Sequence, residues 1–271
     1  MRYPAVAGRF YPDDKDELTA MIKSCFTGDM GPGMPSREGS KRSIVGAIAP
    51  HAGYVASGTN AAHVYKQILE DGLPEAYILV GPDHNGVPYD FVMCNEDHVT
   101  PLGTCQVHEG IAKKLKELIP NDCSAHRLEH SIEVQIPFIQ FIDPDPRIVP
   151  IIMRDQSITA ARELSEHIQE ACKGMDVIVI ASSDMSHYIP KPDAEILNRL
   201  VLDRIEEKDI EGMYSVIKDK KISICGYGPM AAAMISTEPS SIEILEYSDS
   251  WDSLKQDINS VVGYGSALMY R

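Results

Sequence analysis

The sequence predicts a single α/β domain, residues 1–271, with a largely buried central sheet and helices on both faces of that sheet. Short apolar runs rich in Val and Ile alternate with helical patterns along the whole chain. Several of these runs hold no polar residue that could face water, which is typical of strands covered on both sides. A chain of 271 residues buries a substantial core, and no linker-like segment divides it.

The predicted strands are short, mainly apolar runs bounded by turn-forming residues. They cover residues 44–49, 76–80, 91–94, 148–153, 177–181, 242–247 and 266–270. The predicted helices lie between these runs and repeat their apolar residues at helical spacing, which favours helices packed on one sheet. They cover residues 14–25, 57–71, 109–118, 131–141, 158–172, 193–207 and 229–235. Residues 28–42 are rich in Gly, Pro, Ser and charge, so we expect a surface loop there.

Composition argues against several classes of partner. Forty acidic and twenty-five basic residues give a formal charge of −15, which repels phosphate backbones and anionic lipids, so we expect neither nucleic acid nor a membrane as a partner. No apolar run approaches the roughly eighteen residues of a membrane span, and the first residues lack the apolar stretch of a signal peptide, so we expect a cytoplasmic protein. The six cysteines form no CxxC pair in a chain that needs no disulfide for stability, so we expect reduced thiols.

Side chains that bind metals or move protons follow several of the apolar runs. These residues are His51, His84, Asp184, His187 and Cys225. In an open α/β sheet, the loops that leave the carboxyl ends of neighbouring strands share one rim, so distant residues meet there. Imidazole, carboxylate and thiolate are the common ligands of transition metals. The sequence therefore predicts a metal site at this rim.

Each candidate also has a simpler interpretation. A histidine after a strand, such as His51 or His84, can be a hydrogen-bonded loop residue. Cys225 precedes a predicted helix start, which would lower its pKa and favour the thiolate, but a free cysteine is often just a small buried residue. Asp184 and His187 would share one face of a helical turn, with Asp184 orienting His187 as a general acid or base. Alternatively, Asp184 caps a helix and His187 is exposed.

The remaining polar candidates are expected to have structural roles. Glu129, His130 and Glu133 lie at a predicted helix start, where capping and a solvated face are the ordinary interpretation. His130 could also line the pocket and support a metal ligand. The other histidines have polar neighbours and are predicted to be surface residues. They are His63, His98, His108, His126 and His167.

Six motifs occur in the order in which the Memo family has them. They are PAVAGRFYP, PHAGYVASG, GPDHNG, EHSIEVQIPF, SSDMSHY and CGYGP. The chain resembles that family over almost its full length, and the resemblance implies the fold of the class III extradiol ring-cleaving dioxygenases. It also implies a vestibule in which His51, His84 and Cys225 replace the two-histidine, one-glutamate iron site of those enzymes. Asp184 and His187 would line the same vestibule, whereas Asn85 stands where several Memo-like sequences have a second histidine.

Three functions follow from these residues. A thiolate in place of the carboxylate disfavours ring cleavage and favours iron of altered redox character, copper or zinc. We therefore expect metal-dependent redox chemistry on a small substrate, with iron or copper bound and His187 transferring protons. The first alternative is a module that binds a peptide or small ligand in this pocket without catalysis, and the second is a zinc hydrolase. The resemblance also implies a radical-SAM pathway partner. This chain has no CxxxCxxC motif of its own, so any such chemistry would belong to that partner.

Overall fold

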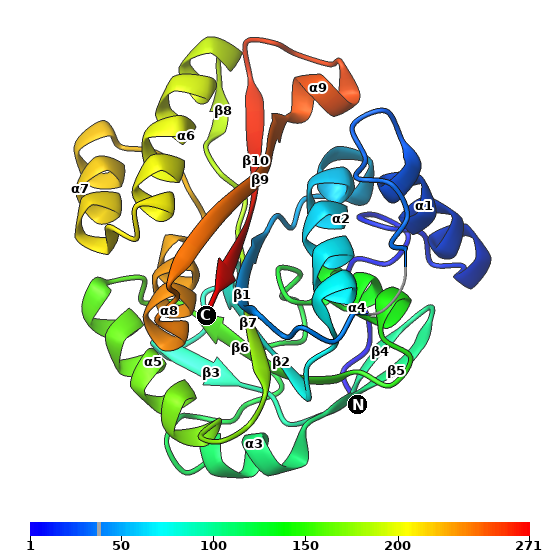
Figure 1. Cartoon of the computed structure of the whole chain (residues 1–271), viewed down its shortest axis with the longest axis vertical. Coiled ribbons are helices and arrows are strands. Elements are labelled where there is room, and N and C mark those ends of the chain that lie inside the picture. Colours follow the sequence, from blue (N-terminus) through cyan, green and yellow to red (C-terminus); the bar gives the residue numbers. More distant parts are fainter. Residues whose placement is uncertain (37–38) are drawn as a thin grey trace.

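The computed structural model describes residues 1–36 and 39–271, and its strands form a ten-stranded mixed sheet (Figure 1). The strands are β1 (Ile44–Ala49), β2 (Ala76–Pro82), β3 (Phe91–Met93), β4 (His98–Thr100), β5 (Gly103–Val107), β6 (Arg147–Met153), β7 (Val177–Ser182), β8 (His187–Ile189), β9 (Ser241–Asp249) and β10 (Val261–Tyr270). They lie in the order β4-β5-β6-β2-β7-β1-β10-β8, with β3 beside β6 and β9 beside β10.

The centre of the sheet is parallel, and its edges are antiparallel. Strands β5, β6, β2, β7 and β1 all run in one direction, whereas β10 pairs antiparallel with β1, β8 and β9. All seven residues of β2 are buried, as are all but the first residue of β6 and of β7. The Val- and Ile-rich runs are therefore central strands, as their unbroken apolar character predicts.

Helices cover both faces of this sheet. They are α1 (Lys15–Thr27), α2 (Tyr54–Asp71), α3 (Glu109–Leu115), α4 (Ile136–Ile142), α5 (Ile158–Ala171), α6 (Lys191–Glu206), α7 (Ile210–Lys220), α8 (Tyr227–Thr237) and α9 (Ser250–Leu254). Helix α2 packs against β1, β9 and β10, with α1 and α4 beside it. Helix α8 packs against β1, β2 and β7, with α5 outside it, so the two groups enclose the sheet (Figure 1). The predicted α/β class is confirmed.

Several short elements were not expected from the sequence. Strands β4, β5 and β8 and helix α9 are too short or too polar to give a clear periodic signal. Helix α7 is different, because its buried residues Met213 and Ile217 do repeat at helical spacing. The predicted helix 131–141 consists of a 3₁₀ turn, η1 (Glu133–Gln135), followed by α4. The described part of the predicted loop 28–42 contains no helix or strand, and residues 37–38 lie outside the described residues.

The expectation of reduced thiols is wrong for one pair, because Cys94 and Cys123 form a disulfide. Cys94 follows β3, and an isolated bridge between Met93 and Asn121 brings the returning chain alongside that strand. The two Cα atoms are consequently 4.5 Å apart although the residues are 29 positions apart in sequence. No CxxC motif marks this pair, because only the tertiary fold brings the two cysteines together. Four other cysteines are free: Cys25, Cys105, Cys172 and Cys225.

Two histidines predicted to lie on the surface are buried instead. The ring of His98 contacts the carbonyl of Glu96 at 3.0 Å, and the ring of His126 contacts the carbonyl of Val92 at 3.0 Å. Burial lowers the pKa of His98 to about 3 and that of His126 to about 4. Their polar sequence neighbours indicated exposed side chains. Each ring can nevertheless be buried, because it finds a backbone carbonyl as hydrogen-bond acceptor inside the fold.

Glu133 is also buried and does not belong to a solvated helix face. Its carboxylate forms an ion pair with Arg2 and accepts hydrogen bonds from Tyr11 Oη and from the backbone N–H groups of Ala5 and Val6. This network fixes the first residues of the chain against η1. The segment that precedes η1 carries Glu129 and His130, so the N-terminal residues help to position it.

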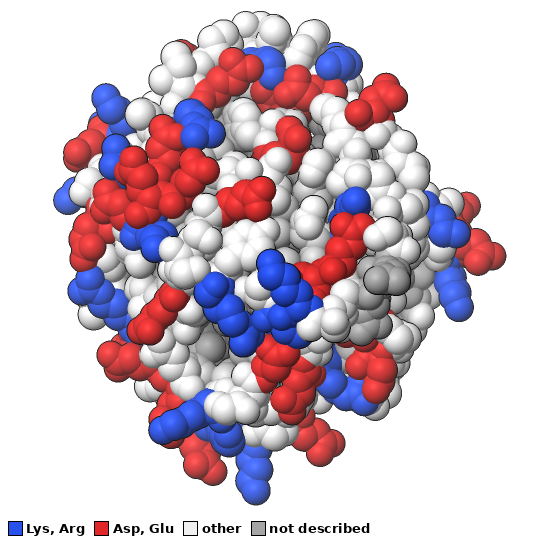
Figure 2. All heavy atoms as spheres, in the orientation of Figure 1, with Lys and Arg blue, Asp and Glu red and all other residues white. Residues whose placement is uncertain are grey.

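The surface carries charges of both signs. On the face in Figure 2, acidic and basic side chains are intermingled and do not form a single basic patch. Among the described residues, no helix has the length and apolar character needed to cross a membrane.

Candidate metal centre

Three adjacent parallel strands deliver the predicted site residues to one rim of the sheet. Strand β7 lies between β1 and β2, and all three run in the same direction. Their carboxyl ends lead directly to His51, His84 and Asp184, as the rule for open α/β sheets predicts. Gly81, near the end of β2, leaves no room for a Cβ because Ser131 lies against it. This close contact lets the segment with Glu129 and His130 cover the rim.

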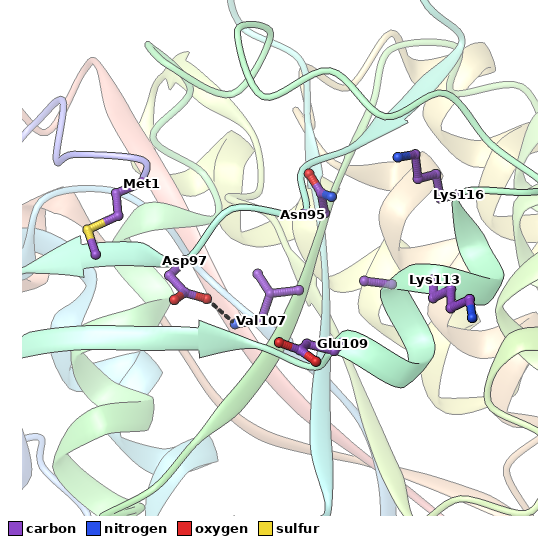
Figure 3. A pocket seen from close by; sticks show the side chains of 8 residues that line it. Met1, Asn95, Asp97, Val107, Glu109, Lys113 and Lys116 are labelled. Atoms are coloured by element: carbon purple, nitrogen blue, oxygen red, sulfur yellow. Dashed lines mark hydrogen bonds between the residues drawn. The ribbon is translucent and has the colours of Figure 1, made fainter.

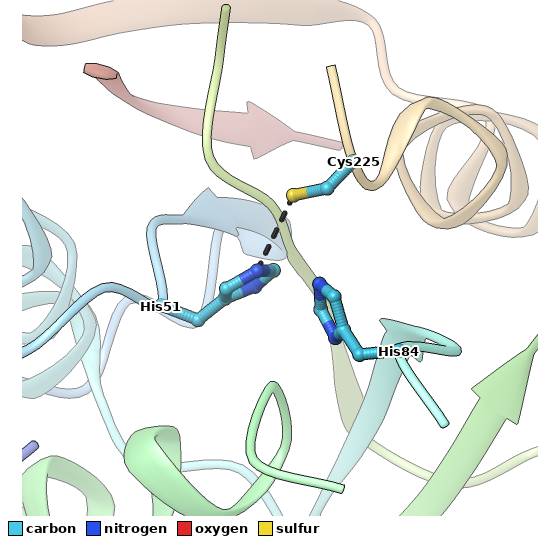
Figure 4. A group of neighbouring side chains, drawn as sticks. All are labelled: His51, His84 and Cys225. Atoms are coloured by element: carbon cyan, nitrogen blue, oxygen red, sulfur yellow. Dashed lines mark hydrogen bonds between the residues drawn. The ribbon is translucent and has the colours of Figure 1, made fainter. Parts of the chain in front are cut away.

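The side chains of His51, His84 and Cys225 converge at this rim (Figure 4). Their candidate ligand atoms all lie within 4.8 Å of one another, and His51 Nε2 is 3.3 Å from Cys225 Sγ. Distances of this size allow one ion to contact three donors at ordinary ligand lengths of roughly 2.0–2.3 Å. The convergence expected from the strand ends is therefore confirmed, and the group is a candidate metal-binding arrangement.

A hydrogen-bond chain fixes the tautomer of His51. The hydroxyl of Ser182 donates its only proton to the carbonyl of Ser131 (2.6 Å) and accepts a hydrogen bond from Gln135 Nε2 (2.8 Å). The 3.0 Å contact between Ser182 Oγ and His51 Nδ1 therefore requires Nδ1 to donate. His51 Nε2 then carries a lone pair, and it faces Cys225 Sγ. Burial, with the charge of His84, lowers the pKa of His51 to about 3, so this ring is neutral.

A buried carboxylate orients His84 in the same way. Nδ1 of His84 lies 2.8 Å from Glu129 Oε1, so it donates to that oxygen and leaves Nε2 free. Burial alone would lower the pKa of His84, but the hydrogen bond and charge of Glu129 raise it overall. Glu129 is buried, so the expectation of a solvated helix face is wrong for it as well. A histidine held by a carboxylate behind it is the usual arrangement around a bound metal ion.

Glu129 itself is saturated with hydrogen bonds. It accepts them from His84 Nδ1, from Asn85 Nδ2 and from the backbone N–H groups of His84, His130 and Ser131. Burial alone would raise its pKa, but these donors, with His84 first among them, hold the pKa well below its ordinary value. Although His84, Glu129 and His130 also have donor atoms within 4.8 Å of one another, the carboxylate has no lone pair left for an ion. Glu129 therefore supports His84 and is a poor ligand.

His130 lies over the other two imidazoles with its ring partly open to solvent. Its ring centroid is 4.5 Å from that of His84 and 5.5 Å from that of His51. Its side chain is 20% exposed and that of His84 is 31% exposed, whereas His51 is buried. Burial and the neighbouring His51 lower the pKa of His130 to about 4. Solvent and small molecules therefore reach the group from the side of His84 and His130.

Cys225 is placed by the loop before α8. A Cβ on Gly226 would lie 2.6 Å from that of Ser183, so glycine allows this loop to pack on the end of β7. Gln156, from the loop after β6, accepts from the N–H of Gly228 (2.9 Å) and donates to the carbonyl of Cys225 (2.6 Å). The expected lowering of the Cys225 pKa is wrong, because burial, with the charge of Asp184, raises it. Without a metal ion Cys225 is a thiol, facing the lone pair of His51 Nε2.

Asp184 and His187 lie beside the group, but not in the expected relation to each other. No helical turn joins them, because His187 begins β8. Asp184 Oδ1 accepts from the backbone N–H of His51 (2.8 Å), and burial raises the pKa of Asp184. The ring of His187 instead donates from Nδ1 to the carbonyl of Ser223 (2.6 Å). His187 lies close enough for its charge to act on the pKa of both His51 and Asp184.

Residues that sequence reasoning missed provide much of the support. Ser182 and Gln135 hold His51, Gln156 holds the Cys225 loop, and Ser223 holds His187. Gln135 carried a usable signal, since it is an amide at the end of η1, directly before the apolar residues that begin α4. Ser182 ends the buried strand β7, whereas Gln156 and Ser223 lie in loops where nothing in the sequence distinguishes them from ordinary loop residues.

A surface pocket elsewhere carries no comparable chemistry. It has a volume of about 510 Å³ and lies between β5 and α3 (Figure 3). Glu109, Lys113 and Lys116 line it, and Asp97 accepts a hydrogen bond from the N–H of Val107 (2.9 Å). Neither of the candidate ligand groups found among the described residues includes a residue of this pocket.

Comparison with known proteins shows similarity to one family over almost the whole chain. The family model described as Memo-like protein matches residues 2–268. A MEMO1 family protein of Methanobrevibacter smithii is 40% identical over 99% of both chains. One from Nitrosopumilus maritimus is 40% identical over 98% of both chains. The crystal structure of an uncharacterized protein from Escherichia coli K12 covers 83% of this chain and 99% of its own, with a TM-score of 0.55 and 12% identity. That likeness shows the shared fold.

Proposed function

The chain belongs to the Memo-like protein family, and we propose that it binds a redox-active transition metal, iron or copper, through His51, His84 and Cys225 and acts on a small substrate. The observation that carries this proposal is that both imidazoles are held in the tautomer that can bind a metal ion. In each, hydrogen bonding commits Nδ1 as a donor and leaves Nε2 for an ion, through Ser182 for His51 and Glu129 for His84. A structural role for these histidines would not explain why two free Nε2 lone pairs and one thiol converge at the same point.

The donor set suits a transition metal. Two neutral imidazoles and one thiolate combine borderline and soft donors, which favours iron, copper or zinc over magnesium or calcium. A bound iron or copper ion would supply electron transfer to a substrate or to oxygen at its open positions. Because the pKa of the Cys225 thiol is raised, binding must release its proton, and the affinity rises with pH.

The protein side chains supply binding and proton transfer. His84 and His130 form the side of the group that solvent reaches, so a substrate would approach over them. His187 donates from Nδ1 to Ser223, which leaves Nε2 as the atom that takes up or releases a proton. Asp184 keeps the His51 backbone in place through its carboxylate and does not hold the ring of His187.

Elemental analysis of anaerobically purified protein tests the proposal. We expect stoichiometric iron or copper in the natural protein and in two controls, Cys172→Ala and His63→Gln, which change the same residue types away from the rim. His51→Ala and Cys225→Ala should lose the metal and keep a cooperative thermal transition, because the core of so large a domain does not depend on an ion. Equal metal content in Cys225→Ala would overturn the ligand assignment.

The oxidation state of the bound metal separates the candidate functions. Electron paramagnetic resonance should show a signal that changes between reductant and oxygen in the natural protein and is absent in Cys225→Ala. Bound zinc with no such change would exclude redox chemistry and favour hydrolysis. Ligand binding that persists in the metal-free His51→Ala variant would favour a binding module.

A further inference from the structure

The disulfide between Cys94 and Cys123 lies beside a second surface pocket and is accessible from one side. Cys94 is fully buried, whereas Cys123 is half-buried. Cys123 helps to line a pocket of about 420 Å³, together with Glu96, Arg127, Leu128 and residues 1–5. A reagent that enters this pocket therefore meets Cys123 and not Cys94.

The surroundings of the two sulfurs favour attack in one direction. In thiol–disulfide exchange, an incoming thiolate bonds to one sulfur and the other leaves as a thiolate. Attack on Cys123 would release Cys94, whose Sγ is 3.4 Å from the backbone N–H of Glu96. This donor stabilises negative charge on the departing sulfur. Arg127 at the pocket wall supplies a positive charge that attracts the incoming thiolate.

The rim of the pocket suits a protein as the reagent. Tyr3 and Leu128, which line the pocket, are 67% and 66% exposed. Large apolar side chains exposed around a pocket are typical of protein contact sites. Because the reactive group that this pocket presents is a disulfide, the matching partner is a protein that carries a dithiol.

We propose that the Cys94–Cys123 bond is an exchange site for a dithiol protein, and that its redox state sets how firmly Glu129 holds His84. One partner thiolate bonds to Cys123 Sγ as the S–S bond breaks, and Cys94 leaves as a thiolate and takes up a proton. The second partner thiolate then displaces Cys123, which also takes up a proton. The partner ends as a disulfide, and this chain has gained two electrons and two protons.

The segment from Cys123 to Glu129 couples the bond to the metal centre. Hydrogen bonds also hold the backbone and His126 of this segment: His126 Nε2 donates to the Val92 carbonyl (3.0 Å), and Arg2 donates to the carbonyls of His126 (3.1 Å) and Glu129 (2.6 Å). Opening the disulfide removes the covalent tie to the end of β3 and leaves these bonds in place. Glu129 therefore becomes more mobile without being released. This half of the proposal rests on the proposed metal centre.

Trapping the mixed disulfide tests the exchange site. The folded natural protein is incubated with a thioredoxin-type reductant whose resolving cysteine has been replaced, and the adduct is digested and sequenced by mass spectrometry. We expect the reductant on Cys123. An adduct on Cys94, a bond that opens only in urea, or free Cys94 and Cys123 thiols in protein purified in air would each overturn the proposal.

Hydrogen–deuterium exchange of the metal-free protein tests the coupling independently of metal binding. Reduction should speed exchange over residues 123–130 in the natural protein and in the control Cys105→Ser. Cys123→Ser should exchange fast at the start and show no further change on reduction. Equal exchange in oxidised and reduced natural protein would overturn the coupling.

Metal affinity then links the bond to the centre. Reduction should weaken metal affinity about tenfold. This is the low end of the loss that follows when a residue hydrogen-bonded to a metal ligand is altered. If the oxidised and reduced proteins bind metal equally, the coupling is wrong. If neither binds metal, the proposed metal centre fails, while the trapping experiment still decides the exchange site.

Discussion

Glu129 illustrates how one buried side chain can orient a candidate metal-binding histidine without itself binding the metal ion. Five donors surround its carboxylate, and four of them come from His84 and its neighbours Asn85 and His130. A carboxylate held in this way stays ionised, and its charge keeps Nδ1 of His84 protonated. Ser182 does the same for His51 with a neutral hydroxyl.

Replacing Glu129 by Gln should weaken metal binding while preserving the shape of the site. The amide keeps the volume but removes the charge and one acceptor, so His84 loses the partner that fixes its tautomer. We expect a loss of about 10- to 100-fold in affinity, measured by competition with a chelator. Glu166→Gln, at an exposed position of α5, is the matched control and should bind as the natural protein does. Unchanged affinity in Glu129→Gln would show that His84 needs no such support.

His187→Gln should retain the metal and lose activity. Its ring is held by Ser223, and three other donors already converge at the rim, so His187 is not needed for binding. Loss of a general acid or base typically lowers the rate about 10²- to 10⁴-fold. Metal content can be compared at once with that of His51→Ala. If His187→Gln contains as little metal as His51→Ala does, His187 is a metal ligand.

At the scale of elements, the site depends on segments that are not strands of the sheet. The 129–131 segment reaches the end of β2 over Gly81, and the Cys225 loop reaches the end of β7 through Gly226. The N-terminal segment secures the first of these through the buried pair of Arg2 and Glu133. Strand ends thus place His51, His84 and Asp184, and packed loops place His130 and Cys225.

Glu133→Ala should destabilise the whole domain. It leaves Arg2 buried without its partner and removes the acceptor of Tyr11 and of two backbone N–H groups. Breaking a buried pair in this way costs about 3–5 kcal/mol in the free energy of unfolding, measured by urea denaturation. Glu211→Ala breaks an ion pair whose side chains are 56% and 72% exposed, and should cost about 0–1 kcal/mol. Equal losses in the two variants would contradict the role of the buried network.

At the scale of the molecule, one sheet collects residues that are far apart in sequence. His51 and Cys225 are separated by 174 positions, yet their side chains are in contact. The fully buried central strands make this framework independent of the metal. The fold also buries several imidazoles. Burial disfavours the charged form of an imidazole, so protonation of these rings opposes folding.

Stability should therefore fall as the pH is lowered from about 7 to about 4.5. Burial lowers the pKa of His98 to about 3 and that of His126 to about 4, whereas both imidazoles titrate at about 6.5 in an unfolded chain. Below about pH 6.5 the unfolded state binds more protons, so the free energy of unfolding decreases until the folded rings protonate. Urea midpoints across this range measure the slope. His126→Gln, which keeps a donor for Val92, should show a shallower slope, and an identical slope would refute the assignment.

The sequence by itself determined the framework of this protein and the place of its candidate site. Unbroken runs of Val and Ile are buried from water only in a sheet that is covered on both faces. Loops that leave the carboxyl ends of adjacent parallel strands share one rim, which predicted that His51, His84 and Asp184 meet there. These signals are local, so they can be read without knowing what packs against them.

Only the tertiary structure decided burial, tautomers and pairings. Glu129 and Glu133 look like solvated helix residues until distant segments cover them, and Cys94 meets Cys123 only because the chain returns beside β3. The pKa of Cys225 is raised because burial outweighs the helix start that the sequence shows. Desolvation and hydrogen bonding depend on which groups surround an atom in space, and sequence spacing does not specify those groups.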